Sequence, residues 1–255
     1  MKLDINSDMG EGFGRWTVGD DAGMMKVVSS ANIACGYHAG DHDIMAACVS
    51  AALKQGVAIG AHPGFRDLIG FGRRNMPTNP DEMKNMLVYQ IGALQGVATA
   101  LGHKVTHVSY HAAFGNTVLA DPDLSDALAG QIRRMDPDLI IYSQPGTVVE
   151  KSARRAGLRV MTLFLADRAF LPDGALVPRG QPGAVITDHD QIAERVSRFV
   201  QDGSVVCSDG SVLKYPAKGI LVHSDTPGST ELARIVRETV TSLGVTVAPS
   251  TEIAD

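Results

Sequence analysis

The chain has 255 residues, of which 44% are hydrophobic and 20% are charged, and its formal net charge is −5. This length and composition predict one domain over residues 1–255 with a sizeable core. The lack of a basic excess argues against a nucleic-acid surface, and no apolar run approaches the roughly 20 residues of a membrane-spanning helix. The first residues lack the apolar stretch of a signal peptide. Three cysteines without CxxC spacing favour a reducing compartment, so we expect a cytoplasmic protein.

Short apolar runs predict strands, and longer segments between them predict helices. In chain order the predicted strands are Lys2–Asp8, Ser30–Cys35, Val57–Ala61, Val105–Tyr110, Leu139–Ser143, Arg159–Leu165, Gly219–Val222 and a weaker Val245–Ala248. The predicted helices are His42–Gln55, Asp81–Leu101, Pro122–Met135, Gly146–Ala156, His189–Asp202 and Ser229–Leu243. This alternation favours a parallel sheet, and seven or eight such units favour a closed (β/α) barrel over an open sheet.

Two connections are long for a compact domain. Pro63–Thr78 is rich in Gly and Arg, and Ala169–Ile186 contains three prolines and three glycines. Loops of this length are usually lids or binding loops, although a tolerated surface insertion is the alternative.

Polar residues follow several predicted strands at the point where each strand ends. They are Asp8, His38, His62, His111, Asp167, Arg168, His223 and Asp225. In a parallel barrel these ends lie on one face around one cavity, where polar groups serve catalysis. Each residue alone could instead cap a helix or bind a loop amide. The coincidence of so many in register favours an active site.

The chemistry that these side chains offer is acid–base or metal-assisted. Histidine titrates near neutral pH, and a neighbouring carboxylate can tune it. One Asp with two or three His is also a ligand set for zinc or another divalent metal, although no local motif such as HExxH is present. The sequence therefore leaves both forms of chemistry open.

Glycine-rich segments suggest binding to an anion rather than to a nucleotide. Gly10-Glu11-Gly12-Phe13-Gly14 fails the GxGxxG pattern because Arg15 stands where the third Gly belongs, and no GK[ST] motif exists. The glycines let backbone amides approach an anionic group. Arg73 and Arg74 could pair with a substrate carboxylate, or form an ordinary ion pair.

These segments together resemble the LamB/YcsF family, and the similarity runs nearly end to end. The segments that carry it are Asp4–Gly14 (DINSDMGEGFG), Ser30–Asp41 (SANIACGYHAGD), Ala58–Asp67 (AIGAHPGFRD), Gly70–Arg74 (GFGRR), Tyr89–Gln95 (YQIGALQ), Ala166–Ala169 (ADRA), Leu176–Ile186 (LVPRGQPGAVI) and His223–Gly228 (HSDTPG). The resemblance implies a seven-stranded variant (β/α) barrel, similar to the glycoside hydrolase/deacetylase superfamily.

The resemblance also implies an activity, that of a 5-oxoprolinase A subunit. This is the ATP-dependent opening of the lactam ring of 5-oxo-L-proline to L-glutamate, carried out with partner subunits B and C. ATP would then act through the partner subunits, which fits the missing nucleotide motif. A five-membered lactam is an unstrained amide, so its hydrolysis needs activation and a positioned nucleophile.

The resemblance assigns candidate roles to residues of this chain. The catalytic candidates are Asp8, His38, His62, His111 and Asp167, with Asp8, His62 and His111 in water activation and proton transfer. The substrate-binding candidates are Glu11, Asp41, Arg73, Arg74, Arg168, His223 and Asp225. Asp8, His62 and His111 are also similar to the Asp/His/His metal triad of the related deacetylases.

Two positions depart from the family pattern. The family usually has Lys two residues before the fourth-strand His, where this chain has Ser109, and Glu where this chain has Leu163. A Lys there is a natural partner for an oxyanion or a phosphate. Loss of one positive and one negative group suggests a coupled change, and a paralogue with either a different lactam or amide substrate or a weakened activity. Two alternatives to the lactam-opening role therefore stay open: a metal-dependent deacetylase or amidohydrolase, and a non-catalytic carboxylate-binding paralogue.

Overall fold

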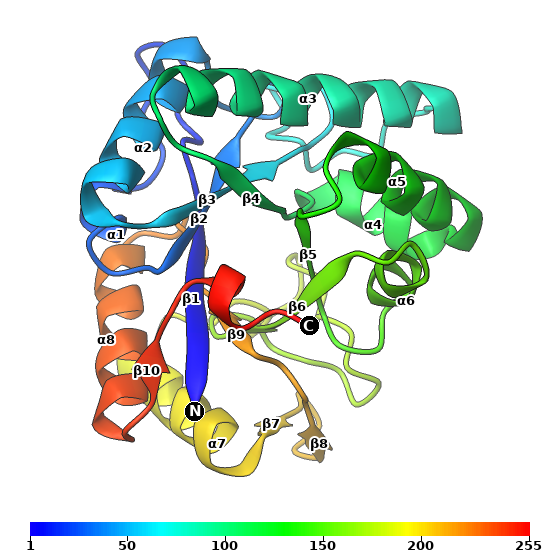
Figure 1. Cartoon of the computed structure of the whole chain (residues 1–255). Helices are drawn as coiled ribbons and strands as arrows, with labels where there is room; N and C mark the ends of the chain where they lie inside the picture. The colour runs from blue at the N-terminus through cyan, green and yellow to red at the C-terminus, as the bar shows by residue number, and fades with distance from the viewer.

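A computed structural model describes residues 1–255 and shows seven parallel strands closed into a barrel (Figure 1). The first six strands of the barrel lie side by side in chain order, and the seventh, β9, pairs with both β6 and β1 to close the ring. The strands are β1 (Lys2–Met9), β2 (Ser30–Ala34), β3 (Ala58–His62), β4 (Val105–Val108), β5 (Ile140–Ser143), β6 (Arg159–Leu165) and β9 (Gly219–Leu221). The predicted seven-stranded (β/α) barrel is confirmed.

Helices surround the barrel (Figure 1). They are α1 (Asp21–Met24), α2 (His42–Gln55), α3 (Pro80–Ala100), α4 (Ala112–Ala120), α5 (Pro122–Met135), α6 (Val148–Arg155), α7 (His189–Asp202) and α8 (Ser229–Ser242). Asn79 and Asp121 accept hydrogen bonds at the N-termini of α3 and α5, and a proline follows each of them. Because these capping signals are visible in the sequence, the predicted start of each helix lies within one residue of the observed start.

The weak C-terminal strand is real but lies outside the ring. β10 (Thr246–Val247) pairs in parallel with β1 at Lys2 and Leu3, and the short 3₁₀ helix η1 (Ser250–Glu252) follows it. Thus β1 is hydrogen-bonded to β10 near its start and to β2 and β9 farther along.

The short helices α1 and η1, the helix α4 and one hairpin were not predicted. The helix α4 follows His111 directly and has no side-chain N-cap, so the usual start signal is missing. The strands β7 (Ser204–Val206) and β8 (Val212–Lys214) form an antiparallel hairpin outside the barrel. Asp209-Gly210 lies in its turn, and an Asp-Gly pair between apolar runs is a hairpin signal that could have found it.

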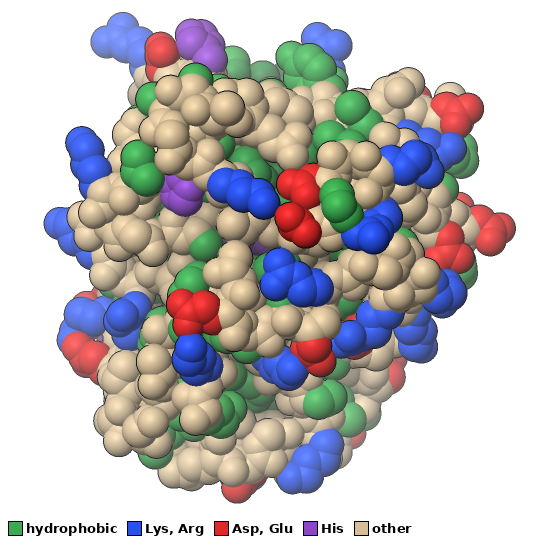
Figure 2. Space-filling view, viewed as in Figure 1, with side chains coloured by type: hydrophobic (Ala, Val, Ile, Leu, Met, Phe, Trp, Pro, Cys, Tyr) green, Lys and Arg blue, Asp and Glu red, His purple; other side chains and the backbone are tan.

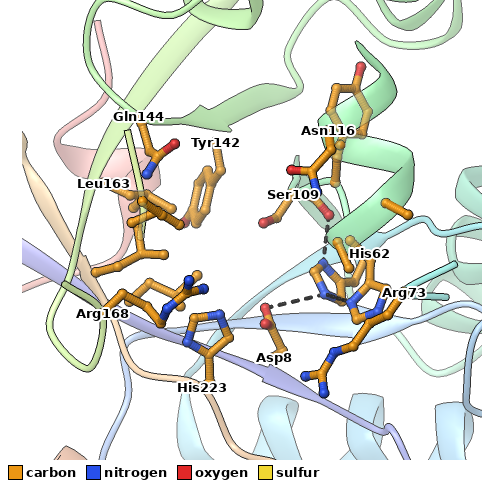
Figure 3. Close-up of a pocket in the computed structure, with 18 of the residues that line it drawn as sticks. Asp8, His62, Arg73, Ser109, Asn116, Tyr142, Gln144, Leu163, Arg168 and His223 are labelled. Atoms are coloured by element: carbon orange, nitrogen blue, oxygen red, sulfur yellow. Dashed lines mark hydrogen bonds and ion pairs between the residues drawn. The ribbon is translucent and has the colours of Figure 1, made fainter. Parts of the chain in front are cut away.

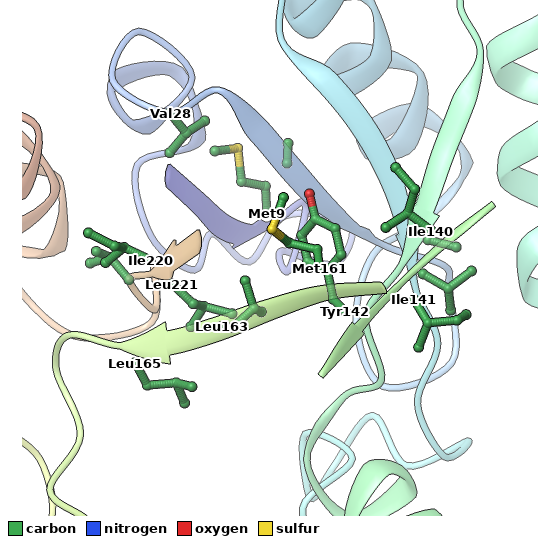
Figure 4. Packing of buried hydrophobic residues seen from close by; sticks show 14 of the residues in the cluster. Met9, Val28, Ile140, Ile141, Tyr142, Met161, Leu163, Leu165, Ile220 and Leu221 are labelled. Carbon is green, nitrogen blue, oxygen red and sulfur yellow. The ribbon is translucent and has the colours of Figure 1, made fainter. Parts of the chain in front are cut away.

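Alternate residues of β6 serve the inside and the outside of the barrel. Leu163 and Leu165 line an internal cavity, whereas Phe164 stacks on Phe199 of α7 with ring centroids 4.6 Å apart. Figure 4 shows Met161 of β6 beside Tyr142 of β5. Because successive side chains of a strand point to opposite faces, every second residue of β6 faces the interior of the barrel.

The surface is mixed in charge. Figure 2 shows Lys and Arg side chains interspersed with Asp and Glu over the face in view. None of the helices combines the length and apolar character needed to cross a bilayer.

Candidate active site

A cavity of about 560 Å³ opens at the carboxyl ends of the strands, within the size range of small-molecule sites. Figure 3 shows side chains from several separate strands directed into it. The residues predicted from the sequence that line it are Asp8, Glu11, His62, Arg73, His111, Arg168, His223 and Asp225. Ser109 and Leu163, the two departures from the family pattern, line the same cavity.

Four buried side chains, Glu11, His38, His62 and His111, form what we call the Glu–His cluster. His62 Nε2 lies 3.0 Å from His111 Nδ1. Glu11 Oε1 lies 3.5 Å from His111 Nδ1, 3.9 Å from His62 Nε2 and 3.1 Å from His38 Nε2. One ligand atom of each residue lies within 4.8 Å of the other three.

Backbone carbonyls fix the tautomers of two rings in the cluster. His62 Nδ1 donates to the carbonyl of Ser109 at 2.7 Å, and His111 Nε2 donates to the carbonyl of Phe71 at 2.8 Å. A carbonyl oxygen can only accept, so each of these nitrogens carries the hydrogen. In the neutral rings the opposite nitrogens, which face each other, therefore carry lone pairs.

Burial controls the ionisation of the cluster. It raises the pKa of the Glu11 carboxyl well above its usual range, and the Asp8 and Asp225 carboxylates raise that pKa further. It also lowers the pKa of His38 and His111 well below the usual histidine range. Burial therefore favours the neutral forms of Glu11, His38 and His111.

The backbone is strained beside His111. Phe71 and Ala112 are the two non-glycine residues with positive φ, 53° and 33°. The Phe71 carbonyl accepts from the His111 ring, and Ala112 follows His111 in the chain. Strain of this kind concentrates at functional sites because the surrounding structure has to hold it.

The loop after β3 covers the cluster closely. At Gly72, whose φ is 63°, an added Cβ would lie 2.6 Å from His38 Cβ and 2.8 Å from His111 Cδ2. At Gly64 it would lie 2.6 Å from His38 Nδ1. Only glycine leaves room for the stacked rings of His38 and His111, whose centroids are 3.8 Å apart.

A chain of buried amides orients Asp8. Asn32 Nδ2 donates to Asp8 Oδ1 at 2.9 Å and to Asn6 Oδ1 at 3.2 Å. His107 Nε2 donates to Asn32 Oδ1 at 2.9 Å, and Gly60 admits its ring because an added Cβ would lie 2.1 Å from it. This network fixes Asp8 Oδ1 and leaves Oδ2 without a hydrogen bond to the protein. Asp8 Oδ1 also lies 3.5 Å from His62 Nε2 (Figure 3).

A second acid–base pair lies across Asp8 from His62. His223 Nδ1 contacts both oxygens of Asp167, at 2.9 and 2.8 Å, which leaves Nε2 for the cavity. Burial disfavours the charged imidazole, but the Asp167 carboxylate outweighs it, so the pKa of His223 is raised. Figure 3 shows His223 and His62 on either side of Asp8. A buried imidazole held by a carboxylate can donate a proton.

Three arginines surround the cavity. Arg73 pairs with Asp225, and Arg179 lies 4.0 Å from the same carboxylate. Burial opposes ionisation of Asp225, but Arg73 outweighs it and lowers its pKa. Arg168 donates through Nε to Ala184 (3.1 Å) and through Nη2 to Val177 (2.6 Å), so it ties down the Ala169–Ile186 loop.

Two predicted substrate-binding residues lie outside the cavity lining. Asp41 is the N-cap of α2, where its Oδ1 accepts from the backbone N–H groups of Asp43 and Ile44. Arg74 is exposed and pairs with the buried Asp67, at 3.0 Å from Nε to Oδ2. Arg74 thus forms the ordinary ion pair that the sequence had left open, and Asp41 serves as a helix cap.

Asn32, His107 and Arg179 belong to the site but were not predicted. Asn32 and His107 lie within predicted strands, and a polar side chain inside an apolar strand was the available signal. Arg179 lies in the long loop after β6 and had no local signal.

The Glu–His cluster only partly coincides with the predicted metal triad of Asp8, His62 and His111. Asp8 approaches His62, but its Oδ1 already accepts from Asn32, and it is not among the four converging ligands. The donor set of one carboxylate and three imidazoles fits a divalent metal such as zinc.

The chain is similar to known proteins along its whole length. A family model described as the LamB/YcsF family matches residues 3–255. The 5-oxoprolinase A subunit of Pectobacterium atrosepticum is 53% identical over 253 residues, covering 99% of this chain and 98% of that protein. A 5-oxoprolinase A subunit of Agrobacterium fabrum, numbered 2, is 52% identical over 254 residues, covering 100% of both.

A solved structure shows the same architecture. The lactam utilization protein from Thermus thermophilus superposes with a TM-score of 0.92 at 42% identity, covering 97% of this chain and 99% of that one. With the family match over residues 3–255, these similarities show that the chain belongs to the LamB/YcsF family.

Proposed function

We propose that this chain is the A subunit of an ATP-dependent 5-oxoprolinase and opens the lactam of 5-oxo-L-proline to give L-glutamate. It is a hydrolase that acts on a cyclic amide. The observation that carries the proposal is the presence of two acid–base pairs at one cavity. In one pair Asp8 lies beside His62, and in the other His223 is hydrogen-bonded to Asp167. The full-length similarity to proteins described as A subunits of 5-oxoprolinase points to the same reaction.

Hydrolysis of a lactam needs a base on one side of the ring and an acid on the other. Water adds through oxygen to the carbonyl carbon, and its proton passes to Asp8, whose free oxygen faces no protein donor. The C–N bond then breaks, and the departing nitrogen takes a proton from His223. The raised pKa of His223 keeps this imidazole protonated to higher pH, as an acid requires.

The arginines suit an anionic substrate. The 5-oxoproline carboxylate carries one negative charge, and a phosphorylated lactam would carry more. Arg73, Arg168 and Arg179 surround the cavity, and Arg168 Nη1 has no protein acceptor. A guanidinium binds a carboxylate or phosphate through paired N–H groups.

ATP and two partner subunits complete the proposed enzyme. The relatives are described as A subunits of 5-oxoprolinase, which implies an assembly of several subunits. We propose that subunits B and C bind ATP and activate the lactam, in the cytoplasm. A cavity of about 560 Å³ exceeds what one small lactam fills, so it has room for an activated form.

The Glu–His cluster favours a second candidate, a metal-dependent amidohydrolase. This alternative predicts hydrolysis by the chain alone, without ATP. The two candidates are distinguished by whether activity requires ATP and partner subunits, because only the 5-oxoprolinase needs them.

Release of glutamate from 5-oxo-L-proline tests the proposal. The assay compares this chain, with ATP, in the presence and absence of B and C subunits from a working enzyme. We expect release only with all three subunits, and its loss in Asp8→Asn. No release in a mixture in which another A subunit is active would refute the 5-oxoproline assignment, and release without ATP would favour the amidohydrolase.

A further inference from the structure

Two imidazole nitrogens that carry lone pairs converge with a buried carboxyl group in the Glu–His cluster. The carbonyls of Ser109 and Phe71 take the ring hydrogens of His62 and His111. The lone pairs of His62 Nε2 and His111 Nδ1 then face each other at 3.0 Å, with Glu11 Oε1 at 3.9 and 3.5 Å. Two lone pairs that face each other at 3.0 Å in a buried site repel, so a proton or a metal cation is needed between them.

The dimensions match a tetrahedral metal site. Zinc bonds to nitrogen or oxygen of about 2.0–2.1 Å place neighbouring ligand atoms about 3.3–3.4 Å apart. Four separations between ligand atoms in the cluster are 3.0, 3.1, 3.5 and 3.9 Å. A shared proton joins two atoms, whereas four donor atoms converge here within 4.8 Å.

The surroundings of the rings are those of metal ligands. A ligating histidine usually donates its other ring N–H to a carbonyl or carboxylate, which fixes its orientation. His62 and His111 both do so, and the strained Phe71 supplies one of the two carbonyls. All four residues are buried, with exposures of 5% or less.

We propose that Glu11, His62 and His111, with His38 as fourth donor, bind one divalent cation such as Zn²⁺. Asp8 is left out of this ligand set because it does not converge with the other four side chains. It lies beside the cation and stays available for a proton. This inference does not rest on the proposed function, since metal binding is measured without substrate or partners.

Zinc titration of the full chain, stripped with a chelator and followed by calorimetry, tests the site. We expect one Zn²⁺ per chain, and Co²⁺ in its place should give the intense visible absorption of a four-coordinate ion. Glu11→Gln and His62→Gln should weaken binding by more than about 100-fold, beyond the loss typical of an outer-shell change. Circular dichroism melts establish that each variant is folded.

Two variants in the same cavity are the controls. Asp8→Asn and His223→Gln should bind Zn²⁺ within a few-fold of the unaltered chain. Loss of binding in Asp8→Asn would overturn the ligand set in favour of Asp8, His62 and His111. Absence of stoichiometric binding by the unaltered chain at 100-fold excess over micromolar protein would overturn the site itself, and the cluster would then share a proton. Neither result bears on glutamate release, so the two proposals fail separately.

Discussion

Replacing Asp4 by Asn should remove a loss of stability that the protein suffers as pH rises from about 4 to about 6. Asp4 is fully buried at the base of the barrel. Burial raises the pKa of its carboxyl from 3.8 to about 6, although hydrogen bonds from Ser30, Ser29, Asn6 and Tyr142 oppose this. The native state therefore holds a proton here that the unfolded chain has already lost.

The size and sign of the effect follow from that shift. A folded pKa about 2 units above the unfolded one corresponds to about 3 kcal/mol. Because the native state binds the extra proton, this contribution is present below pH 4 and is lost as pH rises through about 6. The substituted asparagine carries no titrating proton. Its amide can donate to the Ser29 and Ser30 hydroxyls while its oxygen accepts from Asn6 and Tyr142.

Urea unfolding of both chains between pH 4 and pH 7.5 measures the difference. We expect the stability of Asp4→Asn relative to the unaltered chain to rise by about 3 kcal/mol across this range and then level off. Ser242→Ala on the surface of α8 is the matched control and should give a flat difference. A flat difference for Asp4→Asn as well would mean that Asp4 ionises as it does in the unfolded chain, and would refute the reasoning.

Three further predictions concern the active site. His223→Gln should lower kcat/KM for glutamate release about 10²–10⁴-fold. It should also abolish the fall in activity that occurs as pH rises through the elevated pKa of His223. An unchanged pH profile in this variant would exclude His223 as the acid. Ala112→Gly should raise the free energy of unfolding by about 1 kcal/mol by relieving its positive φ, and a lower value in urea unfolding would contradict the strain. Arg168→Met should speed hydrogen exchange in residues 169–186 while leaving α2 unchanged, and equal rates would mean that other contacts hold the loop.

The sequence was sufficient to find the cavity because strand ends are visible in it. Asp8, His62, His111 and His223 each follow an apolar run, and parallel strands bring such ends to one face. The family resemblance alone could not separate Asp41 from the residues of the cavity. Its position after a strand is also the N-cap position of a helix, and only the three-dimensional path of the chain decides between them.

The four residues of the Glu–His cluster could not be predicted from the sequence as one ligand set, because convergence depends on the direction of each side chain. Glu11 and His38 lie in glycine-containing loops that follow β1 and β2. Their distances to His111 therefore cannot be inferred from positions in the sequence. Asn32 is hidden for a related reason. Its strand is apolar on both sides, and its role appears only when Asp8 and His107 are placed on neighbouring strands.

The two departures from the family pattern change the wall of the cavity rather than its acid–base groups. Ser109 and Leu163 both line the cavity, and replacing one Lys and one Glu leaves its net charge unchanged. Leu163 faces an apolar wall with Leu165 and Leu221, where a carboxylate without a cation at position 109 would be costly. Asp8 and the His223–Asp167 pair make their contacts through other residues, and the Glu–His cluster uses only the backbone carbonyl of Ser109, which any residue at position 109 supplies. Under the mechanism that we propose, the two departures would therefore change which lactam the wall accepts and leave the groups assigned to proton transfer in place.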